Sequence, residues 1–209
     1  MTVSTLYVGT VFCYIRSMKN DSILCHLGAP RTAKPASLAE YGKLRESIIL
    51  SPWAYLSEID FIKAVTEKGQ PFYSCLFTRD LMELGQEKLC WRQQVFAGAD
   101  FDSVDVPVLD MVKRFSGMGL TPHFSYHTFS HNPASGLHNY RLVWKTETDL
   151  SLTYDQTFSA LKKIRELSGN LSDGRATSVS RMWQGSNSGV VTYAPEAELL
   201  DLRKLASNV

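Results

Sequence analysis

The sequence lacks several features that would assign a function directly. It has no apolar run of about 18 residues, the length that a helix needs to cross a membrane. It has no G-x-x-x-x-G-K-[ST] motif, so it carries no P-loop of a helicase. Its first residues lack a basic segment followed by an apolar core, so no secretory signal is expected. We therefore expect a cytoplasmic protein without membrane contact, and any helicase activity that it needed would have to come from a partner or a downstream region.

The chain also has few cysteines and almost no net charge. The four cysteines form no Cys-x-x-Cys pair, which favours free thiols in a reducing compartment over disulfides or a zinc site. The formal net charge of the 209 residues is only +1, so any contact with nucleic acid would have to come from a local basic patch. Apolar residues make up 44% and charged residues 21%, as is usual for a globular domain.

Apolar periodicity in the second half predicts an α+β fold. The chain alternates as strand, helix, strand, strand, helix, strand, which is the βαββαβ order of RNA-recognition-like and ferredoxin-like folds. Such a fold predicts one antiparallel sheet, in the order 4-1-3-2, with both helices on one face. Strands are expected at 93–100, 123–130, 139–146 and within 177–193. Helices are expected at 108–115, ended by Gly117, and at 154–167.

The first half predicts an N-terminal α/β lobe. A Pro-containing segment with two cations, residues 28–37, predicts a loop. We expect one domain over 1–209, with this lobe at 1–90 and a palm-like subdomain with a C-terminal helix at 91–209. The elements expected in the lobe are strands at 3–15 and 72–77 and helices at 38–48, 52–68 and 80–89.

Two acids, Asp100 and Asp102, follow the apolar run of the strand at 93–100. On an extended chain they share one face, while Phe101 points to the other. Two neighbouring carboxylates repel each other unless a cation lies between them, and Mg²⁺ or Mn²⁺ prefers such oxygen ligands. The plain alternative is a strand end that runs into a solvated acidic turn.

The βαββαβ order brings further polar residues to the same edge of the sheet. The second strand would end there at Ser130 and His131, and the third would begin there with His138 and Arg141. The loop after the second helix carries Asp173. Carboxylates, imidazoles and cations together suit a metal–phosphate site. Two further cations, Arg175 and Arg181, are expected nearby.

Each of these residues also has an ordinary interpretation. His131 and His138 flank a polar loop, and Asp173 lies in a segment typical of turns. Arg141 would be solvated if its strand lay at a sheet edge. His123 and His127 share a strand face and resemble a metal pair, although packing or surface roles are more usual for such residues.

The order of these motifs resembles the archaeo-eukaryotic primase superfamily, in particular the primase-polymerase-like domains at the N-termini of phage and mobile-element replication proteins. The resemblance covers about residues 91–193. Its motifs are Ala-Asp-Phe-Asp at 99–102, Thr-Phe-Ser-His at 128–131, His-Asn-Tyr-Arg-Leu-Val-Trp at 138–144, Asp173, and Ser-Arg-Met-Trp-Gln-Gly at 180–185.

The resemblance implies a DNA primase or polymerase that copies a single-stranded template from nucleoside triphosphates. It implies two Mg²⁺ or Mn²⁺ ions bound by the catalytic residues Asp100, Asp102 and Asp173. An acid often precedes the basic residue that corresponds to Arg181, whereas residues 177–180 here are Thr-Ser-Val-Ser. The residues that the resemblance assigns to the nucleotide are Ser130, His131 or His138, Arg141 and Arg181.

Contacts with DNA and two other functions remain open at this point. A non-catalytic replication-initiation module with a relic site would share the same residues. A rolling-circle nickase shares the core but usually needs a His-hydrophobic-His motif, and residues 123–127, His-Phe-Ser-Tyr-His, have the wrong spacing. The candidate contacts with the DNA backbone, which are otherwise solvated surface cations, are Arg31, Lys34, Arg79, Lys88 and Arg92.

Overall fold

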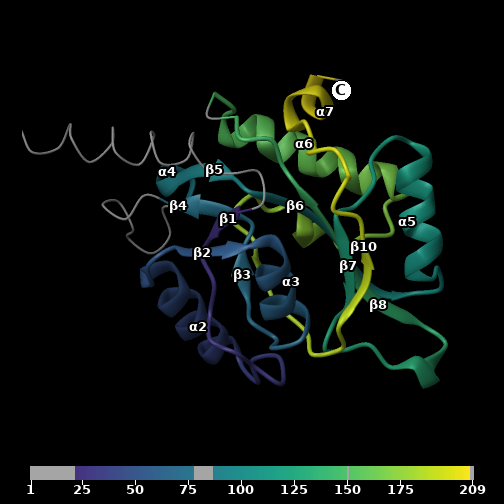
Figure 1. Cartoon of the computed structure of the whole chain (residues 1–209), viewed down its shortest axis with the longest axis horizontal. Coiled ribbons are helices and arrows are strands. Elements are labelled where there is room, and N and C mark those ends of the chain that lie inside the picture. The colour runs from purple at the N-terminus through teal and green to yellow at the C-terminus, as the bar shows by residue number, and fades with distance from the viewer. Residues whose placement is uncertain (1–21, 78–86, 150, 208–209) are drawn as a thin grey trace, which may run out of the picture.

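The computed structural model describes residues 22–77, 87–149 and 151–207 (Figure 1). The predicted strand at 3–15, most of the predicted helix at 80–89, and Arg79 lie outside the described residues. The fold is α+β, with antiparallel sheets throughout the part that is described. Among the described helices, none combines the length and the apolar character that crossing a membrane would require.

A four-stranded antiparallel sheet positions the candidate site. The predicted βαββαβ chain order is present, but the expected sheet order 4-1-3-2 is wrong, because the first strand lies at an edge and the last strand pairs with the second. The sheet order is β10-β7-β8-β6. The four strands are β6 (Phe96–Val104), β7 (Phe124–His127), β8 (His138–Lys145) and β10 (Val190–Tyr193).

The segment after the second helix explains this order. At Asp173 the chain donates one backbone hydrogen bond to Asp100 of β6, at 2.8 Å, and then turns away. It next forms β9 (Met182–Trp183), which pairs with β3 (Phe72–Tyr73) in the N-terminal part. The chain therefore reaches the sheet again only at β10, on the side of β7.

Both predicted helices, α5 (Val108–Gly117) and α6 (Tyr154–Leu167), pack on one face of the sheet, as expected. Helix α6 begins at a capping box in which Thr153 and Gln156 bond each other's backbone. Alternate residues of β6, including Phe101, point into this core together with Phe115 and Ile164 of the helices. The alternation places the neighbouring residues of β6, Asp100 among them, on the opposite face.

The N-terminal part covers that opposite face (Figure 1). Phe61 of α3 (Glu58–Thr66) stacks on Phe96 of β6, with ring centroids 4.8 Å apart, and Val65 and Phe124 join the same core. The sheet is therefore buried on both sides. The remaining elements are β1 (Ser22–Cys25), α2 (Leu38–Leu50), β2 (Ala54–Ser57), β4 (Cys75–Phe77), α4 (Glu87–Cys90), β5 (Trp91–Gln94) and α7 (Leu202–Ser207).

Several predicted boundaries differ from the structure for tertiary reasons. The strand expected at 93–100 is two strands, because β5 pairs with β4 whereas β6 pairs with β8. The helix expected at 52–68 begins only at Glu58, because residues 54–57 pair with β1 and Ser57 caps the helix. Cys25 and Cys75 are buried free thiols, as predicted.

Candidate active site

Strand β6 carries the two acids, and it separates their environments. The strand does not end at residue 100 but continues to Val104, with an irregularity in its pairing after Phe101. Asp100 is therefore inside the sheet and only 5% exposed, while Asp102 is exposed. The alternative of a solvated acidic turn is consequently wrong for Asp100.

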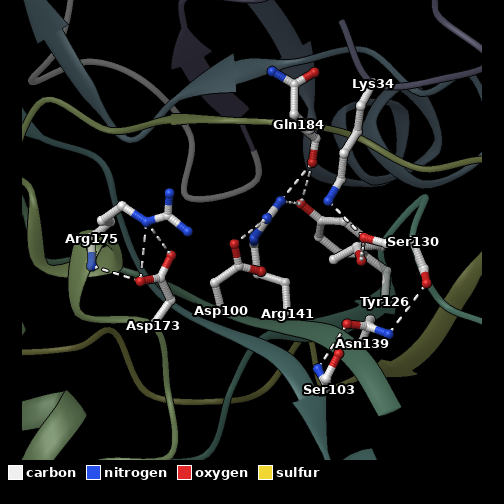
Figure 2. Close-up of polar contacts among 11 residues, drawn as sticks. Lys34, Asp100, Ser103, Tyr126, Ser130, Asn139, Arg141, Asp173, Arg175 and Gln184 are labelled. Atoms are coloured by element: carbon white, nitrogen blue, oxygen red, sulfur yellow. Dashed lines mark hydrogen bonds and ion pairs between the residues drawn. The ribbon is translucent and has the colours of Figure 1, made fainter. Parts of the chain in front are cut away.

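Arg141 of β8 lies directly opposite Asp100 and forms a buried ion pair with it. Its Nη2 donates to Asp100 Oδ2 at 2.8 Å, and its Nη1 donates to the Tyr126 hydroxyl at 2.7 Å and to the Gln184 carbonyl at 2.6 Å (Figure 2). Burial by itself would lower the pKa of Arg141, but the Asp100 charge raises it overall. Arg141 is thus a buried charged residue, not a solvated residue at a sheet edge.

Asp173 comes next to Asp100 through the backbone, but its carboxylate has a partner of its own. It caps the short 3-10 helix η3 (Gly174–Thr177) by accepting from the Arg175 backbone N–H at 3.0 Å, and it pairs with Arg175 Nε at 3.0 Å. Figure 2 shows the Asp100 carboxylate turned to Arg141 and that of Asp173 turned to Arg175. Asp173 therefore has the turn-forming role that its sequence context indicated. Its backbone also lies against β6, next to Asp100.

The three acids form one electrostatic cluster centred on Asp102. The pKa of Asp102 is raised, first by partial desolvation and then by the negative charges of Asp100 and Asp173. The positive charges of Lys34 and Arg141 act in the opposite direction. A cation bound beside Asp102 would relieve this repulsion.

The carboxylates fit a divalent ion only in part. Asp100 Oδ1 is buried and has no hydrogen-bond partner. Together with the carboxylate of Asp102, it provides oxygen ligands of the kind that Mg²⁺ or Mn²⁺ prefers. To bind the same ion, Asp173 would have to leave Arg175, whose side chain is 78% exposed. Within residues 22–77, 87–149 and 151–207, no three His, Cys, Asp or Glu side chains already form a metal-binding group.

Three histidines gather at the same end of the sheet. His131 stacks on His127, with ring centroids 3.8 Å apart, and His138 lies 6.0 Å from His131. Burial, and then the neighbouring imidazoles, lower the pKa of His127 and of His131. Sequence reasoning expected two of these residues but not His127, which ends β7 four residues before His131.

His123 is buried elsewhere, where Nδ1 accepts from the Lys145 N–H at 3.2 Å, so His123 and His127 do not form a metal pair.

Asn139, which sequence reasoning missed, joins the acidic strand to the loop after β7. Its Oδ1 accepts from the backbone N–H of Ser103 at 2.8 Å, and its Nδ2 donates to the Ser130 carbonyl at 3.2 Å (Figure 2). Its backbone N–H donates to His131 Nδ1 at 3.3 Å. This buried amide therefore sets the position of Ser130 and His131 relative to Asp102. In the sequence, the only sign of this role was that Asn139 directly follows His138 at the start of the predicted strand.

The Trp183 ring lies close to the guanidinium groups of both Arg141 and Arg181. The guanidinium carbon of Arg141 lies 4.5 Å from the Trp183 ring centroid, and that of Arg181 lies 5.9 Å from it. Arg181 is partly buried, and its Nε atom has no hydrogen-bond partner. This arginine lies beside the Asp100–Arg141 pair rather than on open surface.

The cations predicted to contact DNA occupy different surroundings. Arg31 pairs with Glu40, and Lys88 pairs with Asp155 at 2.8 Å. Arg92 lies in β5. Lys34 instead reaches the site itself, where its Nζ donates to Ser130 Oγ at 2.6 Å (Figure 2).

Comparison with known proteins found a similar solved structure and no matching family. No protein-family model matches the chain, and no curated protein matches it. Among solved structures, the chain is similar to the AEP domain of the primase-polymerase of cyanophage S-2L. The two share 13% sequence identity with a TM-score of 0.45, over 96% of this chain and 95% of that one. The functional proposal below therefore rests on the site.

Proposed function

We propose that this chain is a DNA-directed nucleotidyltransferase of the primase or primase-polymerase kind. Its substrates would be nucleoside triphosphates and a single-stranded DNA template, in the replication of a phage, plasmid or other mobile element. One observation carries the proposal: Asp173 is bonded through its backbone to Asp100, which lies two residues before Asp102, so three carboxylates meet at one end of the sheet beside three histidines and a lysine. Helicase activity would come from a partner or a downstream region.

The site supports phosphoryl transfer by charge and position. Divalent ions held by Asp100, Asp102 and Asp173 would neutralise charge on the reacting phosphates and polarise them. The protein's own hydrogen-bond donors come from the segment after β7 and from the start of β8. The Ser130 hydroxyl and the imidazoles of His131 and His138 would bind phosphate oxygens. Arg181 would add positive charge at the rim.

Arg141 has a positioning role in this proposal. Its terminal nitrogens make three hydrogen bonds to protein atoms and its side chain is buried, so we assign it to holding Asp100 rather than to contacting a phosphate. The pair instead holds Oδ2 of Asp100, which leaves Oδ1 as the oxygen without a partner. Asp100 is therefore oriented before any substrate arrives.

The test is nucleotide addition by the wild type and by Asp102→Asn, assayed by primer extension and by de novo priming with Mg²⁺ or Mn²⁺. Asp102 is exposed, so the substitution removes one anionic ligand with little effect on folding. Asp110→Asn, on the exposed side of α5, is the matched control. We expect activity to be lost in the first variant and kept in the second. Equal activity and equal Mn²⁺ affinity in wild type and Asp102→Asn would remove the proposal.

A non-catalytic DNA-binding replication module is the second candidate. Two of its three carboxylates are already paired with Arg141 and Arg175, as they would be in a relic site. This function predicts binding of single-stranded DNA, weakened steeply by salt, without nucleotide addition under any metal condition. Salt-independent binding, or no binding at low salt, would contradict both candidates.

A further inference from the structure

Lys34 lies on a loop that is fixed at its base. The loop joins β1 to α2, and its backbone is bonded to the turn after α3. Gly28 N donates to the Pro71 carbonyl at 2.7 Å, and Arg31 N donates to the Lys68 carbonyl at 3.0 Å. The position of Lys34 over the sheet edge is therefore set by the packing of the N-terminal part, not by the lysine side chain alone.

The ammonium group of Lys34 lies at the hydroxyl groups of the segment that follows β7. Its Nζ is 2.6 Å from Ser130 Oγ, which in turn lies 3.3 Å from Thr128 Oγ1. Asn139 links the backbone of Ser130 to that of Ser103, which follows Asp102 in β6, so Lys34 is joined to the acidic strand through Ser130 and Asn139. Figure 2 shows the side chain extending toward Ser130.

Lys34 differs from Arg31 and Lys88 because no carboxylate neutralises its charge in the part of the chain that is described. Arg31 and Lys88 each form an ion pair with a carboxylate, whereas in the described part of the chain Lys34 has no ion pair within 4.0 Å. An ammonium group has three donors, and Ser130 uses one of them. Two donors and a full charge therefore remain, next to the hydroxyl and imidazole groups that the proposed function assigns to phosphate.

We propose that Lys34 binds the phosphates of the incoming nucleoside triphosphate and does not contact the DNA backbone. This inference rests on the proposed function. A triphosphate beside three carboxylates meets strong repulsion, which bound metal relieves on one side and which needs a cation on the other. Lys34 supplies that cation as a point charge, and the N-terminal part thereby completes a site that the sheet begins.

The test measures binding of ATP, dATP and inorganic tripolyphosphate, each with Mg²⁺ and without DNA, by titration calorimetry. Lys34→Gln should weaken all three about 10- to 100-fold, the usual range for one charge-assisted hydrogen bond. Lys34→Arg should restore most of the affinity. Lys113→Gln, which removes an exposed cation of α5 that is paired with Asp110, is the control and should bind as the wild type does.

Binding of a fluorescent oligo-dT measures the other possible role. Lys34→Gln should bind it within about twofold of the wild type when no nucleotide is present. A loss of oligo-dT binding with unchanged nucleotide affinity would overturn the inference and make Lys34 a DNA contact. Unchanged affinity for ATP, dATP and tripolyphosphate in Lys34→Gln would overturn it while the proposed function stands. A wild type that binds none of the three would overturn both.

Discussion

Replacement of Asp100 by Asn is expected to unfold the protein much more readily than replacement of Asp102. The two acids are equivalent in a sequence motif, but Asp100 is 5% exposed and pairs with Arg141, which is 4% exposed. Asparagine keeps the shape of the side chain and removes its charge. The guanidinium of Arg141 would then remain buried without a counter-ion.

The expected cost follows from that buried charge. Removing one partner of a buried ion pair typically costs about 3–5 kcal/mol. For a chain of this size, about 2–4 °C of melting temperature corresponds to 1 kcal/mol, so Asp100→Asn should melt about 6–20 °C lower. Asp102→Asn should change stability by no more than about 0.5 kcal/mol, because this side chain is exposed and its charge is repelled by its neighbours.

Thermal and urea unfolding at pH 7 in EDTA, followed by circular dichroism, measure both variants without metal. The control is the double variant Asp100→Asn/Arg141→Met, which removes both charges and should recover part of the loss. Equal losses for Asp100→Asn and Asp102→Asn, or a loss below about 1 kcal/mol for Asp100→Asn, would refute a structural ion pair. The result also decides which acid can test catalysis, because a variant that fails to fold cannot.

Two further predictions concern histidines. The pKa of His123 is lowered to about 4, mainly by burial, so between pH 6.5 and 4 the unfolded chain binds a proton that the folded chain does not. Stability should therefore fall by about 3 kcal/mol on acidification through this window. In His123→Asn this part of the fall should vanish in urea unfolding followed against pH, and an unchanged slope would contradict it. In NMR titrations, His127 should protonate below its ordinary pKa, and His131→Asn should raise that midpoint by removing a repelling imidazole. A midpoint that stays where it was would show that the stacked rings do not interact.

Much of the fold could be predicted from the sequence because it depends on neighbouring residues. Helix α6 spans 154–167 as predicted, since its apolar spacing and the cap at Thr153 are local signals. The opposite faces of Asp100 and Phe101 follow from the alternation of an extended chain. The βαββαβ chain order also survives, as does the placement of both helices on one face of the sheet.

The arrangement of the strands and the state of each site residue depended on tertiary structure. The sheet order differs from the expected one because residues 182–183 pair with β3, a contact between segments more than a hundred residues apart. Asp100 and Asp102 have the same residue type and the same face, yet only Asp100 has Arg141 opposite it. Lys34 reaches Ser130 across 96 residues of sequence. Such contacts follow from how whole elements pack, and no periodicity or motif within a single segment contains that information.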